Sequence, residues 1–161
     1  MRFLITDDAP SILKVMKRFL ETHGHTVELA ENGNQSLERL KSGLVDFDLM
    51  ITDLNMPVMD GYESVRRFRE WETTNSMMRQ DSDDGGDGGD GGGKEQLQFP
   101  IIAMSANSDE ETLHDVLAVG MDAFIPKPFD YKALVRELHA SGLMSRVMVR
   151  RERVDAAKEE G

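Results

Sequence analysis

The 161-residue chain contains no cysteine, which excludes a disulfide scaffold and any metal site built on thiolates. It has no apolar run of membrane-spanning length and no secretory leader pattern at its start. Basic residues are scarce relative to acids, with 19 Lys and Arg against 30 Asp and Glu, a formal net charge of -11. Because contacts to nucleic-acid phosphates need a basic face, this balance argues against nonspecific nucleic-acid binding. We expect a protein of a reducing compartment, located in the cytoplasm.

The composition and the pattern of apolar residues predict one globular domain. Hydrophobic residues make up 39% and charged residues 30% of the chain, enough for a real core. Short apolar runs alternate with segments of helical periodicity, which predicts a mostly parallel sheet covered by helices on both faces. In the first helix, one stripe is expected to face the core: Ile12, Leu13, Met16, Phe19 and Leu20. The five expected strands lie at about 2–6, 27–30, 47–53, 97–105 and 123–125, each followed by a helix.

One segment, Thr73–Gln96, differs from the rest in composition. It carries six acids and two bases, and residues 81–93 hold seven of the chain's 14 glycines. Such a segment cannot bury enough apolar surface to order itself, which predicts a disordered surface insertion after the third helix. It lacks the spacing of an EF-hand loop, so a linker is favoured over a Ca²⁺ site. The expected organisation is a domain over 1–145 with this insertion, and a charged tail over 146–161.

Polar side chains follow four of the predicted strands. Asp7 and Asp8 follow the first, Asp53 ends the third, Ser105 ends the fourth and Lys127 follows the fifth. In a doubly wound sheet these strand ends lie at one edge, so three carboxylates, a hydroxyl and an ammonium should meet there. Taken singly, each would also fit a turn, a helix cap or a solvated charge. The four histidines show no ligand spacing and are expected at the surface: His23, His25, His114 and His139.

The chemistry of this cluster favours a divalent cation and a phosphoryl group. Three acids at close range repel one another unless a cation is present. An all-oxygen donor set suits Mg²⁺, which binds one or two carboxylates together with phosphate oxygens and water. A lysine and a hydroxyl can hold a phosphoryl group, and a carboxylate such as Asp53 can act as the nucleophile and form an acyl phosphate.

These motifs together resemble the receiver domain of two-component response regulators, of the chemotaxis-regulator type. The matching residues are Asp7-Asp8, Asp53 with the run 56–63 (Met-Pro-Val-Met-Asp-Gly-Tyr-Glu), Ser105-Ala106 and Lys127-Pro128-Phe129. The match covers about 1–142 apart from the insertion. It implies a flavodoxin-like (βα)5 three-layer sandwich, an α/β fold with a parallel five-stranded sheet in the order 2-1-3-4-5.

The resemblance also implies a role for each matching position. Asp53 would be the phospho-acceptor, assisted by Lys127 and Ser105. Ser105 and Phe124 would form the conformational switch, although an aromatic residue beside a short strand is also typical of plain core. Asn55 and Asn107 would tune hydrolysis of the acyl phosphate, and the bond before Pro128 would be cis. The Mg²⁺ ligands, with Mn²⁺ able to substitute, would be Asp7, Asp8, Asp53 and the backbone carbonyl of Asn55.

The implied partners are a histidine kinase or a histidine phosphotransfer protein, with an unknown downstream partner at the face of the fourth helix and fifth strand. The run 56–63 resembles the receivers of hybrid histidine kinases, so the chain is expected to be either a single-domain regulator or the cytoplasmic receiver of a larger membrane kinase. Two alternatives stay open: a hydrolase or phosphotransferase with an aspartyl-phosphate intermediate, and a receiver that acts only as a scaffold without being phosphorylated.

Overall fold

The structure is a computed structural model that describes residues 1–43, 46–80 and 97–159. Five strands form one parallel sheet in the order β2-β1-β3-β4-β5. This confirms the predicted flavodoxin-like fold and its strand order. The strands are short, four or five residues each: β1 Arg2–Thr6, β2 Thr26–Ala30, β3 Leu49–Asp53, β4 Ile101–Ser105 and β5 Ala123–Pro126.

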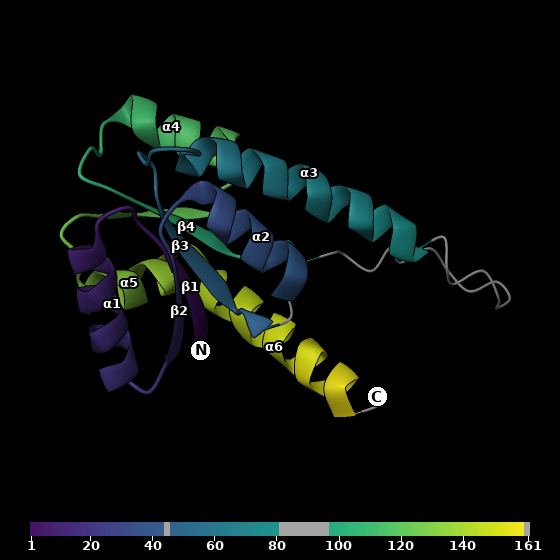
Figure 1. The fold of residues 1–161 in the computed structure, drawn as a ribbon. Helices are drawn as coiled ribbons and strands as arrows, with labels where there is room; N and C mark the ends of the chain where they lie inside the picture. The colour runs from purple at the N-terminus through teal and green to yellow at the C-terminus, as the bar shows by residue number, and fades with distance from the viewer. Residues whose placement is uncertain (44–45, 81–96, 160–161) are drawn as a thin grey trace, which may run out of the picture.

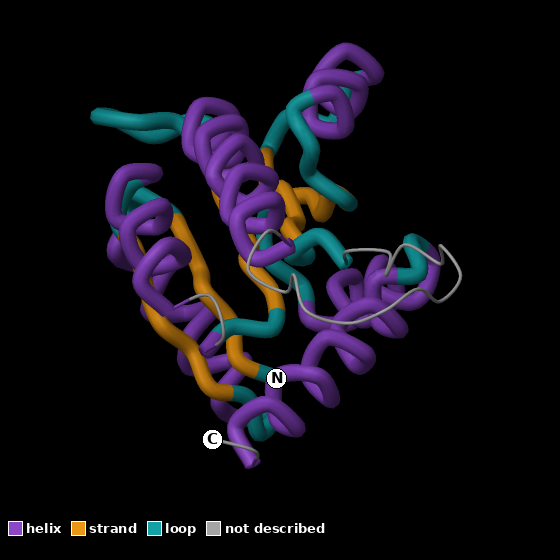
Figure 2. Tube along the Cα trace, turned by 90° about the vertical axis from the view of Figure 1, so that its right-hand side faces the viewer, coloured by secondary structure: helices purple, strands orange, loops and turns teal. Residues whose placement is uncertain are grey.

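Helices cover both faces of this sheet (Figure 1, and Figure 2 in the view turned by 90°). One core cluster joins the sheet to α1 and α5, and the other joins it to α2, α3 and α4. The result is three layers, as strict alternation of strands and helices predicts. In chain order, the helices are α1 Pro10–Thr22, α2 Gly33–Gly43, α3 Gly61–Gln80, α4 Glu110–Ala118, α5 Tyr131–Ala140 and α6 Leu143–Glu159.

The strand register brings the strand ends to a common edge. Thr6 of β1 is paired with Thr52 of β3, and Asp53 is paired with Met104 of β4. Ser105 is paired with Pro126 of β5. Every residue of β3 and β4 is buried, so these central strands are fixed by apolar contact on both faces. The polar groups that follow the strands are therefore held on a rigid support.

The first part of the predicted disordered insertion is helical. Helix α3 continues to Gln80, so the first eight residues of the segment predicted to be disordered, Thr73–Gln80, are helical. Composition was misleading here because the acidic and glycine-rich stretch starts only at Asp81, and the polar residues before it tolerate a helix. The rest of that predicted segment, 81–96, lies outside the described residues.

The predicted charged tail is helical as far as Glu159. Helix α6 starts at Leu143, so the boundary expected between 145 and 146 falls inside a helix. Val147 is 1% exposed, and the Arg146 guanidinium donates to an Asp122 oxygen at 2.6 Å. The Arg150 guanidinium lies 5.0 Å from the centre of the Phe99 ring. We therefore describe α6 as part of the folded body.

Phe19 and His25 depart from the expected burial pattern. Phe19, predicted to face the core, is 45% exposed. Its ring stacks on exposed His23 at 5.2 Å between ring centres. His25, expected at the surface, is partly buried, with its Nε2 2.9 Å from the Tyr131 hydroxyl. In the described part of the chain, no helix is long and apolar enough to cross a membrane.

Candidate phosphoryl-acceptor site

The first two acids of the site follow β1 directly. Asp7 is fully buried, whereas Asp8 is exposed. One Asp7 oxygen accepts a hydrogen bond from the Ala9 amide at 2.8 Å, which directs the chain into α1. Pro10 begins that helix, where its missing N–H is not needed. The turn therefore presents one fixed carboxylate and one that is open to solvent.

Asp53 lies at the end of β3 and is 5% exposed. The chain then turns back, because the Gly61 amide donates to the Leu54 carbonyl at 2.9 Å. A Cβ atom at Gly61 would overlap the Asp53 carbonyl oxygen, so only glycine fits there. This close return holds Asn55, which is exposed, beside the buried carboxylate.

Lys127 joins two of the acids. Its ammonium lies 3.0 Å from Asp7 Oδ2 and 3.3 Å from Asp53 Oδ1. Its backbone amide donates to the Ser105 carbonyl at 2.9 Å, which ties the end of β5 to β4. The Lys127–Pro128 peptide bond is cis. Lys127 follows the edge strand β5, and its side chain thus reaches the acids at the ends of β1 and β3.

The cluster carries an excess of negative charge. Asp7, Asp8 and Asp53 each place one oxygen within 4.8 Å of the others, and the Lys127 ammonium offsets one of their three negative charges. Burial and the Asp7 carboxylate raise the pKa of Asp53, against the opposing effects of Lys127 and of the Asn55 amide. Burial alone would lower the pKa of Lys127, but its hydrogen bond to Asp7 and the charge of Asp53 raise it.

The donor set suits a small, hard divalent cation. The three acids offer carboxylate oxygens, and no Cys or His of the described residues belongs to this group, which favours Mg²⁺ over zinc or copper. A 2+ charge would balance the two negative charges that Lys127 leaves uncompensated. Because Asp8 is exposed, the site is open on one side, and Mg²⁺ usually keeps several water ligands.

Comparison with known proteins gives this arrangement a family. Residues 3–83, half of the chain, match the response regulator receiver domain. The chain belongs to this family. Histidine kinase 3 of Arabidopsis thaliana is 33% identical over 137 residues, which cover 85% of this chain and 13% of that kinase. The chain thus spans a small part of the length of this relative.

Solved structures of receivers share this fold. The chemotaxis protein CheY4 of Vibrio cholerae is 27% identical, with a TM-score of 0.63 over 87% of this chain and 97% of that one. The receiver of the Saccharomyces cerevisiae regulator Ssk1, solved with the phosphotransfer protein Ypd1, gives a TM-score of 0.72 at 23% identity over 91% of each chain. Receiver domains act in two-component signalling and bind Mg²⁺ at an acidic cluster, and Asp7, Asp8 and Asp53 form such a cluster here.

The receiver's two expected switch residues lie on neighbouring strands. Ser105 is 4% exposed, and its Oγ accepts a hydrogen bond from the Asn107 amide at 3.1 Å. Because that bond uses only a lone pair, the Ser105 hydroxyl proton stays available for a further acceptor. Phe124 of β5 is partly buried against the core cluster that contains Ala103 and Val116. Asn107 is exposed, and its side-chain oxygen accepts from the Asp109 amide at 3.3 Å.

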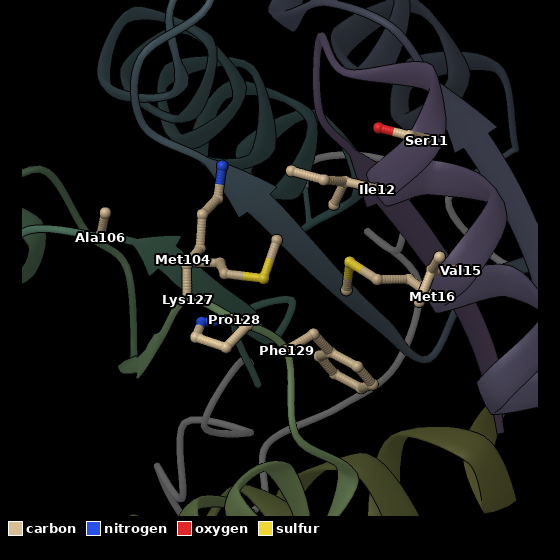
Figure 3. Close-up of a pocket in the computed structure, with 9 residues that line it drawn as sticks. All are labelled: Ser11, Ile12, Val15, Met16, Met104, Ala106, Lys127, Pro128 and Phe129. Atoms are coloured by element: carbon tan, nitrogen blue, oxygen red, sulfur yellow. The ribbon is translucent and has the colours of Figure 1, made fainter.

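An apolar pocket adjoins the acidic cluster and was missed by sequence reasoning. The pocket, of about 530 Å³, lies between α1 and the segment after β5. Figure 3 shows Ile12 and Met16 of α1 on one side, with Met104 and Phe129 opposite and the Lys127 side chain beside them. Val15, also in its lining, is 62% exposed. The sequence did contain one sign of this pocket, because Val15 is an apolar residue of α1 that lies outside the buried stripe of the helix.

Proposed function

We propose that Asp53 of this receiver accepts a phosphoryl group from a phosphohistidine of a histidine kinase or a histidine phosphotransfer protein. The observation that carries this is the geometry of Asp53, a buried carboxylate within one acidic cluster and 3.3 Å from an ammonium. In the transfer, a bond forms between an Asp53 oxygen and phosphorus. The phosphorus–nitrogen bond of the donor breaks, and the imidazole keeps its electron pair.

Asp53 must be ionised to attack, and its surroundings contain groups that favour the ionised form and groups that disfavour it. Burial disfavours the carboxylate, whereas Lys127 and the Asn55 amide favour it. The cation would be held by the Asp7, Asp8 and Asp53 carboxylates and by the Asn55 carbonyl. When bound, Mg²⁺ or Mn²⁺ supplies positive charge that neutralises the phosphoryl oxygens.

Lys127 and Ser105 would contact the phosphoryl oxygens of the product. Once the Asp53 oxygen carries the phosphoryl group as an acyl phosphate, the Lys127 ammonium can turn from that carboxylate to a phosphoryl oxygen. The Ser105 hydroxyl keeps its bond from the Asn107 amide and donates its own proton to a second phosphoryl oxygen. Movement of Ser105 would open space for Phe124 and bias the face of α4 and β5, which a partner reads. Asn55 and Asn107 flank the acyl phosphate and would set its rate of hydrolysis.

The donor would dock over the pocket beside Lys127. Ile12, Val15 and Phe129 give this surface its apolar character, and it is continuous with the acceptor site through Lys127. The Ssk1 receiver was solved with such a donor, the phosphotransfer protein Ypd1. Relatives of this chain are histidine kinases, so a hybrid kinase carrying this receiver and a single-domain regulator are the two settings in which it would act.

Phosphorylation by a small phosphodonor tests the proposal directly. With Mg²⁺ and acetyl phosphate, the wild-type chain should gain the mass of one phosphate, as a species that hydroxylamine cleaves. Asp53→Asn should abolish this gain. Asp60→Asn is a matched control, because Asp60 is an exposed acid in the same loop that caps the Glu63 amide at 2.8 Å, and asparagine can keep that cap.

Two outcomes would count against the proposal. Equal labelling of Asp53→Asn and wild type would place the acceptor elsewhere, and absence of labelling in the wild type would favour the scaffold alternative. Steady turnover of a phosphate ester, rather than one stable adduct, would instead support a hydrolase.

A further inference from the structure

The turn between β2 and α2 touches both acid-bearing segments of the site. At one end, the Asp7 amide donates to the Ala30 carbonyl at 3.1 Å. At the other end, the Gly33 amide donates to the Met59 carbonyl at 3.0 Å, within the loop that follows Asp53. Neither Ala30 nor Gly33 has a reactive side chain. Their backbone groups nevertheless link the segment of Asp7 and Asp8 to the segment of Asp53 and Asn55.

Gly33 is in close contact with the loop. A Cβ atom there would lie 2.6 Å from the Met59 carbonyl oxygen, 2.9 Å from the Asp60 carbonyl oxygen and 2.9 Å from Ser64 Cβ. Two of these three atoms belong to the backbone and cannot rotate away. Gly33 is buried and its backbone needs no unusual dihedral angle, so the requirement for glycine comes from this close approach.

Two buried hydroxyls fix the other side of Gly33. The Gly33 carbonyl accepts hydrogen bonds from Ser36 Oγ at 3.0 Å and from Ser64 Oγ at 2.9 Å. The two hydroxyl oxygens lie 3.1 Å apart. Ser36 and Ser64 are 0% and 1% exposed. Since buried polar groups are costly unless hydrogen-bonded, this set of bonds holds the start of α2 against α3.

The loop held in this way has a conformation that its own sequence does not favour. Val58 has a φ of 70°, in the left-handed region that a β-branched residue seldom adopts, and it is 87% exposed. Its side chain therefore contributes little packing to hold it there. Three backbone hydrogen bonds hold the loop. The Met59 amide donates to the Pro57 carbonyl at 2.8 Å across Val58, and the Gly61–Leu54 bond lies within the loop, whereas the Gly33–Met59 bond comes from α2.

We propose that Gly33 is a positioning residue for the cation site. Through its bond to Met59, Gly33 sets the position of the loop that carries the Asn55 carbonyl. The Ala30 carbonyl, at the other end of the same turn, bonds to Asp7 and so keeps this loop at a fixed position relative to Asp7. The inference rests on the proposed function, because it takes Asp7, Asp8, Asp53 and Asn55 as cation ligands. Groups that orient ligands without touching a metal commonly change its affinity by 10- to 100-fold when altered.

Gly33→Ala tests this role, with Gly43→Ala as the matched control in the same helix. At Gly43 a Cβ atom would meet only side-chain atoms, the nearest an Asp46 oxygen at 3.2 Å. Titration calorimetry with MgCl₂ should show about 10-fold weaker binding for Gly33→Ala. Gly43→Ala should bind as the wild type does. Thermal unfolding without Mg²⁺ separates a loss of affinity from a loss of fold.

A kinetic readout distinguishes positioning from general damage. With acetyl phosphate, the Mg²⁺ concentration that gives half the maximal labelling rate should rise about 10-fold for Gly33→Ala. The rate at saturating Mg²⁺ should return to within about twofold of the wild type, since Asp53 and Lys127 are unchanged.

The outcomes separate this inference from the proposed function. If the wild type neither binds Mg²⁺ nor becomes labelled, the proposed function fails. If the wild type does both and folded Gly33→Ala binds Mg²⁺ as well as the wild type does, only the inference about Gly33 fails.

If Gly33→Ala does not fold, Ser64→Ala provides the test. About threefold weaker Mg²⁺ binding supports the inference, since one hydrogen bond to the Gly33 carbonyl is lost and one remains. Unchanged binding by Ser64→Ala would overturn it.

Discussion

The Lys127 ammonium lies 3.3 Å from Asp53 Oδ1, in the same cluster where a cation would bind. We therefore expect the lysine to act as a partial substitute for that cation and also to compete with it. It does not complete the charge balance, because three carboxylates meet one ammonium. This relationship predicts opposite effects of Lys127 on metal binding and on phosphoryl transfer.

Lys127→Gln should strengthen Mg²⁺ binding while slowing phosphorylation. Removal of a positive charge beside the carboxylates should increase Mg²⁺ affinity about fivefold, or ~1 kcal/mol, by calorimetry. The labelling rate at saturating Mg²⁺ should fall about 100-fold, because a preorganised donor to the transferring group is lost. Exposed Lys132 provides the control Lys132→Gln. Weaker Mg²⁺ binding by Lys127→Gln would contradict the competition and show that Lys127 holds the carboxylates in place.

The raised pKa of Asp53 predicts that stability depends on pH. The folded protein binds this proton more tightly than the unfolded chain, whose carboxyl pKa is about 3.9. Stability therefore falls as pH rises from that value through the raised folded pKa, because the buried carboxylate then becomes charged. Without Mg²⁺, Asp53→Asn should gain stability relative to wild type across this window, as measured by urea unfolding at a series of pH values.

Saturating Mg²⁺ provides the control for that pH series. A bound cation favours the charged carboxylate, so the advantage of Asp53→Asn should shrink or reverse. A stability difference that stays constant from acid to neutral pH would show that Asp53 is not the responsible group.

The strand ends could be predicted from the sequence, whereas the contacts around them could not. Asp53 could be placed because β3 is a short apolar run with an acid at its end, and parallel strands place such ends at one edge. The Gly33–Met59 contact could not, because it joins backbone groups of two turns and leaves no signal in side-chain chemistry. Arg146 looked like part of a solvated tail, since its partner Asp122 is 24 residues away and is identified only by the fold.

Helix α6 should contribute to the stability of the domain through its buried face. Val147 is 1% exposed and its neighbour Met148 is 57% exposed. Val147→Ala should lower the free energy of unfolding by about 2 kcal/mol, because two buried methyl groups are removed and a cavity remains. Met148→Ala, a truncation one position along the same helix, should change it by less than about 0.5 kcal/mol. Equal effects in urea unfolding would show that α6 does not pack on the domain in solution.

The apolar surface beside Lys127 should control transfer from a protein donor but not from a small one. Val15→Asp places a charge on this surface, at a side chain that is 62% exposed, so the fold should tolerate it. Transfer from a phosphorylated histidine phosphotransfer protein should slow about 10-fold, since a carboxylate must lose its hydration in the complex. Labelling by acetyl phosphate should be unchanged, because Asp53, Lys127 and the acids are intact.

Leu117 provides a matched control for that experiment. It lies on α4, which packs on the opposite face of the sheet from α1, and it is 61% exposed. Leu117→Asp adds the same charge at the same exposure, and it should leave transfer from both the protein donor and acetyl phosphate unaffected.

If Leu117→Asp slowed transfer from the protein donor and Val15→Asp did not, the donor would dock on the α4 face. An equal loss with both variants would point instead to long-range repulsion between the donor and a chain that already carries a net charge of -11. High salt would then restore transfer, because exposed charges are screened over roughly 10 Å at 0.1 M ionic strength.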